Sequence, residues 1–130
     1  LEGYGVRYKY VRDFSDSLAK QEIEAHLRTG NPVIFVVAAK SRKDGAVANK
    51  WTSGYHCMTM LGMTDTGKVI VADSVDRSTK TFGNNQRIKY ASLGELIGYM
   101  FPCTNTTSTS IYWGGKASSG GYILINPQNQ

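Results

Sequence analysis

One histidine and one aspartate stand where they could act together as a general base. His56 follows Ser53-Gly54-Tyr55, and Asp73 ends the apolar run Val69-Ile70-Val71-Ala72. An imidazole held by a carboxylate can take a proton from a nucleophile and return it to a leaving group. We therefore predict His56 and Asp73 as catalytic residues of a hydrolase. An ordinary cross-strand pair at the surface is the alternative interpretation.

Counting along the chain places these two side chains within reach of each other. Residues 55–63 and 68–72 have the apolar and β-branched composition of strands, and the Thr-Asp-Thr-Gly segment between them is typical of a hairpin turn. A two- or four-residue loop centred on that segment puts Asp73 opposite Met58. His56 shares the face of Met58, because side chains alternate along a strand, so Asp73 becomes its diagonal neighbour. A three-residue loop or a bulge would break this relationship.

The two cysteines are weak candidates for the nucleophile. Cys57 adjoins His56, but adjacent strand residues point to opposite faces, so we expect Cys57 to be a buried, unreactive thiol. Cys103 has no neighbours that recognisably lower its pKa. One disulfide or two free thiols are both allowed. Together with His26 and His56 the cysteines form no zinc pattern, and we predict neither a metal nor a cofactor.

The remaining pattern predicts an α+β fold with one central antiparallel sheet. A helix is expected over residues 17–29, because Leu18 or Ala19, then Ile23 and Leu27, recur every four residues. Gly30 and Pro32 end it, and residues 32–38 form a buried strand. Short strands are expected at 86–90 and 122–125. Ser92-Leu93-Gly94-Glu95 fits a capping box that opens a helix over 92–101.

These elements predict a sheet of about four to six strands in a single domain over residues 1–130. The chain has 130 residues, of which 41% are hydrophobic and 19% charged, as in ordinary folded proteins. Its longest apolar stretch, residues 33–39, is far shorter than the roughly twenty residues of a membrane span, so we expect none. The sequence begins Leu-Glu-Gly without methionine, and we expect it to be a piece of a longer protein.

The net charge of +5 is compatible with an anionic partner. No cluster of five basic residues occurs, and no basic stretch is interleaved with aromatic residues, so we predict no nucleic-acid partner. The segment 40–50 is locally basic, with Lys40, Arg42, Lys43 and Lys50 around a single Asp44. We expect it to border a groove past His56, unless it is simply a solvated loop.

The order of these motifs resembles the papain-like cysteine peptidases, in the branch of the bacteriocin-processing (double-glycine leader) peptidases. The resemblance rests on Gly30-Asn31-Pro32-Val33-Ile34 after a helix, the Ser53-Gly54-Tyr55-His56 motif, Asp73 ending the next strand, and Lys89-Tyr90-Ala91-Ser92-Leu93 opening a late helix. It covers residues 3–101. It implies a papain-like half-domain in which His56 is the catalytic histidine and Asp73 orients it.

The same resemblance places the nucleophilic cysteine, and the glutamine that helps to stabilise the oxyanion, upstream of Leu1. No residue of this chain matches either of them. Asp73 is also followed by Ser74, where the family often has proline. The implied activity is hydrolysis of amide bonds by a cysteine peptidase or amidase, and an upstream cysteine is needed to complete it.

For the substrate, we expect a polypeptide or the peptide crosslinks of cell-wall peptidoglycan. The protein would be a bacterial one, extracellular or associated with the cell wall. Trp51, Gly54 and Tyr55 flank the expected entrance and are predicted to bind substrate. The alternative function is a noncatalytic binding module on the same fold, with Trp51, Tyr55 and Trp113 as aromatic platforms. For Trp51 and Tyr55, packing in the core is an equally good interpretation.

Overall fold

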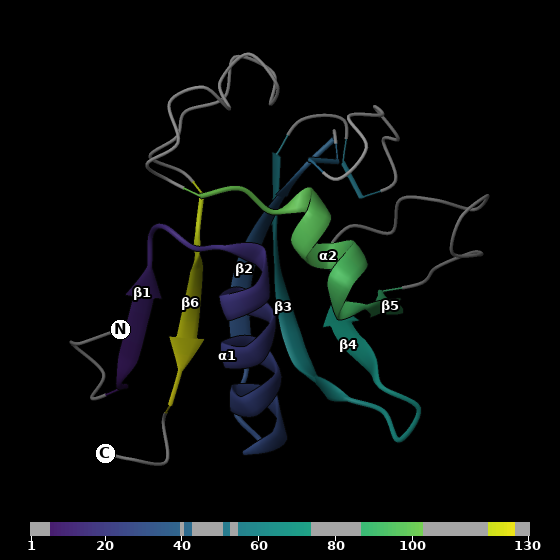
Figure 1. The fold of residues 1–130 in the computed structure, drawn as a ribbon. Coiled ribbons are helices and arrows are strands. Elements are labelled where there is room, and N and C mark those ends of the chain that lie inside the picture. Colours follow the sequence, from purple (N-terminus) through teal and green to yellow (C-terminus); the bar gives the residue numbers. More distant parts are fainter. Residues whose placement is uncertain are drawn as a thin grey trace.

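The computed structural model describes residues 6–39, 41–42, 51–52, 55–73, 87–102 and 120–126. In chain order the elements are β1 (Tyr8–Val11), α1 (Asp16–Arg28), β2 (Val33–Ala38), β3 (Tyr55–Met63), β4 (Lys68–Ala72), β5 (Ile88–Ser92), α2 (Leu93–Tyr99) and β6 (Tyr122–Ile125). The strands form one six-stranded sheet in the order β1-β6-β2-β3-β4-β5 (Figure 1). Every neighbouring pair is antiparallel. The predicted α+β class and sheet are confirmed.

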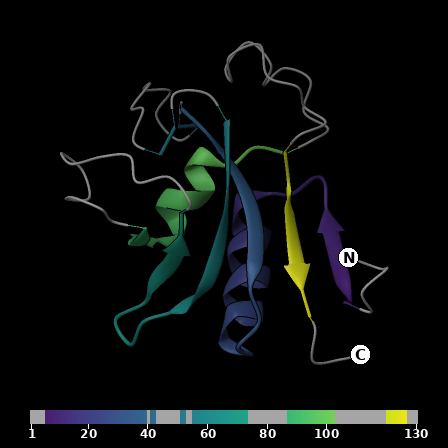
Figure 2. The same ribbon diagram turned by 180° about the vertical axis from the view of Figure 1, so that it is seen from behind.

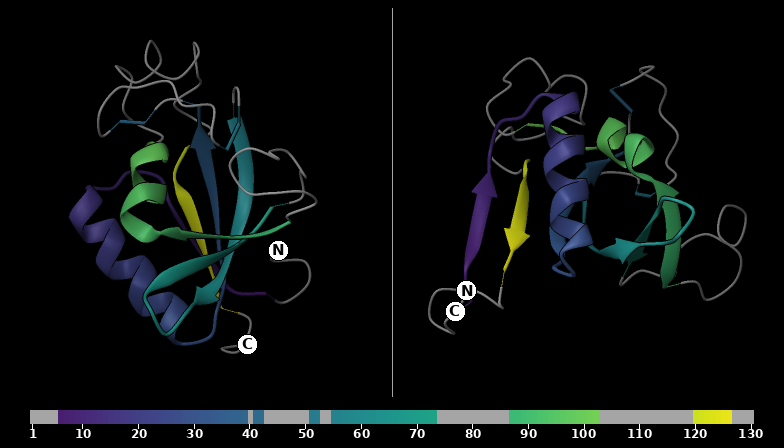
Figure 3. Two further views of the ribbon diagram at one scale, coloured as in Figure 1. Left: turned by 90° about the vertical axis from the view of Figure 1, so that its right-hand side faces the viewer. Right: turned by 60° about the horizontal axis from the view of Figure 1, so that its bottom comes forward.

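Both helices pack on the same face of this sheet. Figure 3 shows α1 and α2 together on one side of the strands, and in Figure 2 the strands stand in front of the two helices. The sheet side chains that point toward the helices alternate along each strand and form the main core. They include Val33, Phe35, Val37, Met58, Met60, Val69, Val71, Ala91, Tyr122 and Leu124. None of the described helices is long and apolar enough to cross a membrane.

Helix α1 forms as the spacing of its apolar residues predicts. The Ser15 side chain accepts a hydrogen bond from the Leu18 N–H at the N-terminus, and Gly30 follows the C-terminus with φ of 87°. Ala19 is fully buried together with Ile23 and Leu27, whereas Leu18 is 65% exposed. Of the two alternatives for the first apolar position, the structure selects Ala19.

Helix α2 starts at the predicted capping box, where Ser92 Oγ accepts a hydrogen bond from the Glu95 N–H at 3.2 Å. It ends earlier than the expected residue 101. Met100 is extended and forms an isolated antiparallel bridge with Val37 of β2. Tertiary pairing with the sheet therefore replaces the last turn of the expected helix.

The edge strand β1 was not among the predicted elements. Three of its four residues are exposed, and it pairs only with β6 among the described strands. An edge strand without a buried alternating face lacks the signal on which strand prediction depends. Strand β5 lies two residues later than the expected 86–90 and continues directly into α2.

Candidate active site

The hairpin of β3 and β4 brings His56 and Asp73 together, though not by the loop we expected. The loop has three residues, Asp65 to Gly67, because the Thr64 N–H bonds to the Lys68 carbonyl at 2.8 Å. The ladder then shifts between Met60 and Gly62, where one extra residue bulges from β3. Either irregularity alone would turn His56 to the face of the sheet opposite Asp73. Together they cancel, and His56 points to the same face as Asp73.

The predicted pairing of these two side chains is confirmed. His56 Nε2 lies 2.5 Å from Asp73 Oδ1. The backbone N–H of Asp73 also bonds to the Arg87 carbonyl at 2.8 Å, which fixes the residue just beyond the end of β4. The Asp73 side chain is 1% exposed and that of His56 is 14% exposed. A reactant can therefore reach the imidazole but not the carboxylate behind it.

The contact also defines which ring nitrogen is available. An ionised carboxylate only accepts hydrogen bonds, so Nε2 of His56 must donate to Asp73. In the neutral ring the lone pair then lies on Nδ1. Nδ1 is the atom that can accept a proton from a nucleophile.

Lys89 is a third member of this cluster, and sequence reasoning missed it. Its Nζ lies 2.6 Å from Asp73 Oδ2, and its side chain is 1% exposed. In β5 the residues at 89 and 91 point inward, while 88, 90 and 92 are exposed. The alternation of the sequence indicated the opposite facing, because the apolar residues Ile88 and Tyr90 are the exposed ones and Lys89 is the inward one.

Cys57 corrects one prediction and supports another. It is exposed, so the expectation of a buried thiol is wrong. Its place between His56 and Met58 in β3 still points it to the opposite face, because β3 pairs regularly with β2 over this stretch. Partial loss of solvent raises the pKa of the Cys57 thiol. The Cys57 thiol thus lies on the opposite face of the sheet from the His56 imidazole, and its pKa is not lowered toward that of a nucleophilic thiol.

The residues predicted to bind substrate are only partly placed. Trp51 is 1% exposed and packs in the main core cluster, so of its two interpretations the structure selects packing in the core over an exposed aromatic platform. Its large ring is instead part of the packing against the sheet. Tyr55 begins β3, and its side chain lies outside the described part of the structure. Gly54, Cys103 and Trp113 also lie outside it.

Arg42 has a structural role that the local charge pattern did not indicate. Its guanidinium donates to the Ile97 carbonyl at 2.8 Å and also to the Met100 carbonyl, and it forms an ion pair with Asp16 at 2.8 Å. These bonds tie the chain after β2 to both helices. Arg42 is therefore already engaged within the fold, whereas Lys40, Lys43 and Lys50 lie outside the described residues.

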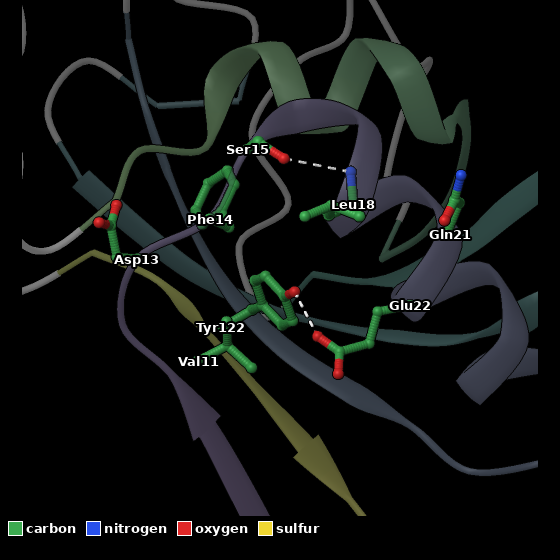
Figure 4. A pocket seen from close by; sticks show the side chains of 8 residues that line it. All are labelled: Val11, Asp13, Phe14, Ser15, Leu18, Gln21, Glu22 and Tyr122. Carbon is green, nitrogen blue, oxygen red and sulfur yellow. Dashed lines mark hydrogen bonds between the residues drawn. The ribbon is translucent and has the colours of Figure 1, made fainter.

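A hollow lined by α1 and the strands β1 and β6 lies away from His56. It has a volume of about 810 Å³ between α1, β1 and β6, and its lining consists of Val11, Asp13, Phe14, Ser15, Leu18, Gln21, Glu22 and Tyr122. Figure 4 shows the Tyr122 hydroxyl directed at Glu22, to which it donates at 2.7 Å. This lining contains no histidine or cysteine. The His56–Asp73 pair is therefore not part of this hollow.

Comparison with known proteins agrees with this arrangement. A family model described as the Peptidase_C39 like family matches residues 2–96. The chain belongs to this family. No match was found among curated proteins, and none among solved structures.

Membership of the Peptidase_C39-like family makes this a domain related to the papain-like cysteine peptidases, of the bacteriocin-processing type. His56, Asp73 and Lys89 all fall inside the matched segment, whereas β6 lies beyond it. In the described residues no three histidine, cysteine, aspartate or glutamate side chains gather as a metal site. The absence of a metal and of a cofactor stays a prediction.

Proposed function

We propose that this domain supplies the base of a cysteine peptidase or amidase, with His56 and Asp73 as its catalytic histidine and orienting carboxylate. The observation that carries the proposal is the 2.5 Å contact between His56 Nε2 and Asp73 Oδ1 on the helix-covered face of the sheet. Family membership supports thiol chemistry in place of a serine or metal mechanism. The exposed fraction of the imidazole leaves it open to a reactant.

In this mechanism His56 moves one proton in each half of the reaction. Nδ1 takes the proton of a cysteine thiol, and the thiolate attacks the carbonyl carbon of the scissile amide. The imidazolium then gives that proton to the leaving amine nitrogen as the C–N bond breaks. In the second half Nδ1 takes a proton from water as the water oxygen attacks the thioester carbonyl. The C–S bond then breaks, the carboxylic acid product leaves, and the imidazolium returns its proton to the departing thiolate. Asp73 stays ionised throughout and stabilises the imidazolium.

The attacking sulfur in this proposal comes from outside residues 1–130. Cys57 points to the reverse face of the sheet from His56, and burial raises its pKa. In the family that the chain resembles, the nucleophilic cysteine lies on a helix N-terminal to the corresponding segment, and we propose the same arrangement here. A helix N-terminus is a favourable place for a thiolate, since the helix dipole lowers the thiol pKa.

For the substrate we propose a peptide, either a polypeptide or a peptide crosslink of peptidoglycan, acted on outside a bacterial cell. The excess of basic residues, with a net charge of +5, supports an anionic surface such as a cell wall. The thiol chemistry and the substrate are separate parts of the proposal, and each has its own test.

Trapping of the acyl-enzyme tests the chemistry. The longer protein that includes the N-terminal cysteine is mixed with an activated peptide ester, quenched in acid and digested for mass spectrometry. We expect the acyl group on the upstream cysteine. Variants Cys57→Ser and Cys103→Ser should label equally well. Acylation of Cys57 or Cys103 would overturn the assignment of the nucleophile.

A hydrolysis assay on purified peptidoglycan and on peptides with a double-glycine leader tests the substrate. Cleavage of one class and not the other assigns it. A longer protein that binds either material without cleaving it and forms no acyl-enzyme would establish the noncatalytic binding module instead.

A further inference from the structure

Asp73 divides its two carboxylate oxygens between two basic side chains. Oδ1 contacts His56 Nε2 at 2.5 Å, and Oδ2 contacts Lys89 Nζ at 2.6 Å. The three residues come from adjacent positions on one sheet face: His56 from β3, Asp73 from the end of β4, and Lys89 from β5. Lys89 stands opposite Val71 in the ladder, and Asp73 is two residues further along the same strand.

A lysine at this inward position needs an explanation, because burial of an ammonium group is costly. Its neighbours on this face of the sheet, Val71 and Ala91, are apolar and buried. An apolar side chain would pack here without loss of hydration. Only 1% of the Lys89 side chain is exposed, so its ammonium group has lost nearly all of its hydration. The contact with the Asp73 carboxylate offsets this loss.

We propose that Lys89 is a positioning residue of the catalytic site, acting on His56 through Asp73. This inference rests on the proposed function of His56 and Asp73. By holding Oδ2, the ammonium prevents the carboxylate from rotating and keeps Oδ1 directed at Nε2. Its positive charge also favours the ionised form of Asp73. Both effects make Asp73 a fixed acceptor, which places the ring proton on Nε2 and leaves Nδ1 as the base.

A merely structural role for Lys89 would predict something different. If the lysine only neutralised a buried charge, its removal would lower stability, and the imidazole would keep its tautomer. If it positions Asp73, its removal releases the carboxylate and the ring proton redistributes between Nε2 and Nδ1. The tautomer of His56 therefore separates the two roles.

The test uses ¹⁵N NMR of the imidazoles in the chain of residues 1–130, at a pH where the rings are neutral. The sequence has only two histidines. His26 Nε2 contacts the Ile125 carbonyl at 2.7 Å, far from Asp73, and serves as an internal reference. We expect His56 to carry its proton on Nε2 in the wild type. In Lys89→Met the fraction with the proton on Nδ1 should rise several-fold, while His26 is unchanged.

Two variants control for charge and for packing. Lys68→Met removes the same group from an exposed position at the other end of β4 and should leave the His56 tautomer as in the wild type. Lys89→Arg keeps the positive charge and should stay close to the wild type. An unchanged tautomer in Lys89→Met would overturn the proposal. Equal shifts in Lys89→Met and Lys89→Arg would also overturn it, because packing would then be responsible.

A double variant keeps the proposal testable if Lys89→Met does not fold. Asp73→Asn and Asp73→Asn/Lys89→Met are compared, because the second removes both buried charges together. Since Lys89 acts through Asp73, the two should show the same His56 tautomer distribution. A further shift in the double variant would mean that Lys89 acts on His56 by another route, and the proposal would fail.

Kinetics of the longer protein extend the test to catalysis. Lys89→Met should lower kcat by at least about tenfold and by less than the roughly 10⁴-fold expected for loss of the carboxylate, with KM unchanged. Lys89→Arg should recover most of the rate. If the wild-type longer protein is inactive, the proposed function fails while the NMR result still decides the role of Lys89. If it is active and the tautomer does not respond to Lys89→Met, only the role of Lys89 fails.

Discussion

Asp73 reaches His56 across a hairpin that contains two compensating irregularities. The three-residue loop after Thr64 reverses the facing of β3, and the extra residue between Met60 and Gly62 reverses it again. The side chains from Met60 back to His56 therefore point to the same faces of the sheet as they would in a regular two-residue hairpin. The geometry of the site depends on the number of residues in β3 as much as on their identity.

This dependence predicts opposite results for two single-residue deletions in β3. Leu61 is the bulged residue and is 46% exposed, so its deletion should leave a continuous ladder with His56 still facing Asp73. Deletion of Thr59 should instead turn His56 and Cys57 to opposite faces from those they now occupy. We expect the Leu61 deletion to change the free energy of unfolding by about 1 kcal/mol or less.

The His56 tautomer and hydrogen exchange of the hairpin amides measure the outcome of these deletions. The Leu61 deletion should keep the proton of His56 on Nε2, and the Thr59 deletion should lose both this preference and part of the amide protection. Loss of the pairing in the Leu61 deletion, or its survival in the Thr59 deletion, would contradict the described register.

The sequence predicted the sheet strands that have a strong pattern, because buried strands such as β2 carry a continuous apolar run. The shared face of His56 and Asp73 was predicted correctly from a wrong loop length, and it holds only because the bulge in β3 offsets the three-residue loop. The compensation by the bulge has no local signature in Met60-Leu61-Gly62, since a bulge is set by pairing across strands. Lys89 was missed because lysine is taken as exposed by default. Only the neighbouring strand shows that this position faces Asp73.

Cys57 should react slowly at neutral pH although it is exposed. Partial burial raises the pKa of its thiol, so the thiolate is scarce at pH 7 and increases as the pH rises through the pKa. In a Cys103→Ser background, the alkylation rate by iodoacetamide should lie below that of a free cysteine peptide at pH 7 and should rise with pH. Cys57→Ser in the longer protein should keep full activity. Fast labelling at pH 7 accompanied by loss of activity would restore Cys57 as a nucleophile.

Glu22, which lines the hollow beside α1, should make the free energy of unfolding depend on pH. Burial alone would raise the pKa of its carboxyl, but hydrogen bonds from Tyr122 and Lys9 outweigh this effect and hold the pKa below its usual value. The folded state therefore favours the charged form. Its stabilisation is present above the pKa of the unfolded chain and is lost as the pH falls through the folded pKa.

Glu22→Gln should accordingly lower the free energy of unfolding at pH 7 by up to about 1 kcal/mol and have a smaller effect at pH 3. Urea unfolding at the two pH values measures this difference. In a Tyr122→Phe background the pH dependence due to Glu22 should shrink, because one of its donors is gone. A Glu22→Gln effect that grows on acidification would show that the carboxyl pKa is raised instead.

The most direct test of the account is the turnover of the longer protein after removal of each imidazole. His56→Ala should lower kcat/KM by about 10³-fold or more, because the general base is removed. Asp73→Asn should lower it by up to about 10⁴-fold, because the ring proton of His56 is no longer held on Nε2. His26→Ala removes the other imidazole, which contacts the Ile125 carbonyl at the opposite end of the sheet, and should leave kcat/KM within a few-fold of the wild type. Comparable activity of His56→Ala and the wild type would contradict the assignment of His56 as the catalytic base.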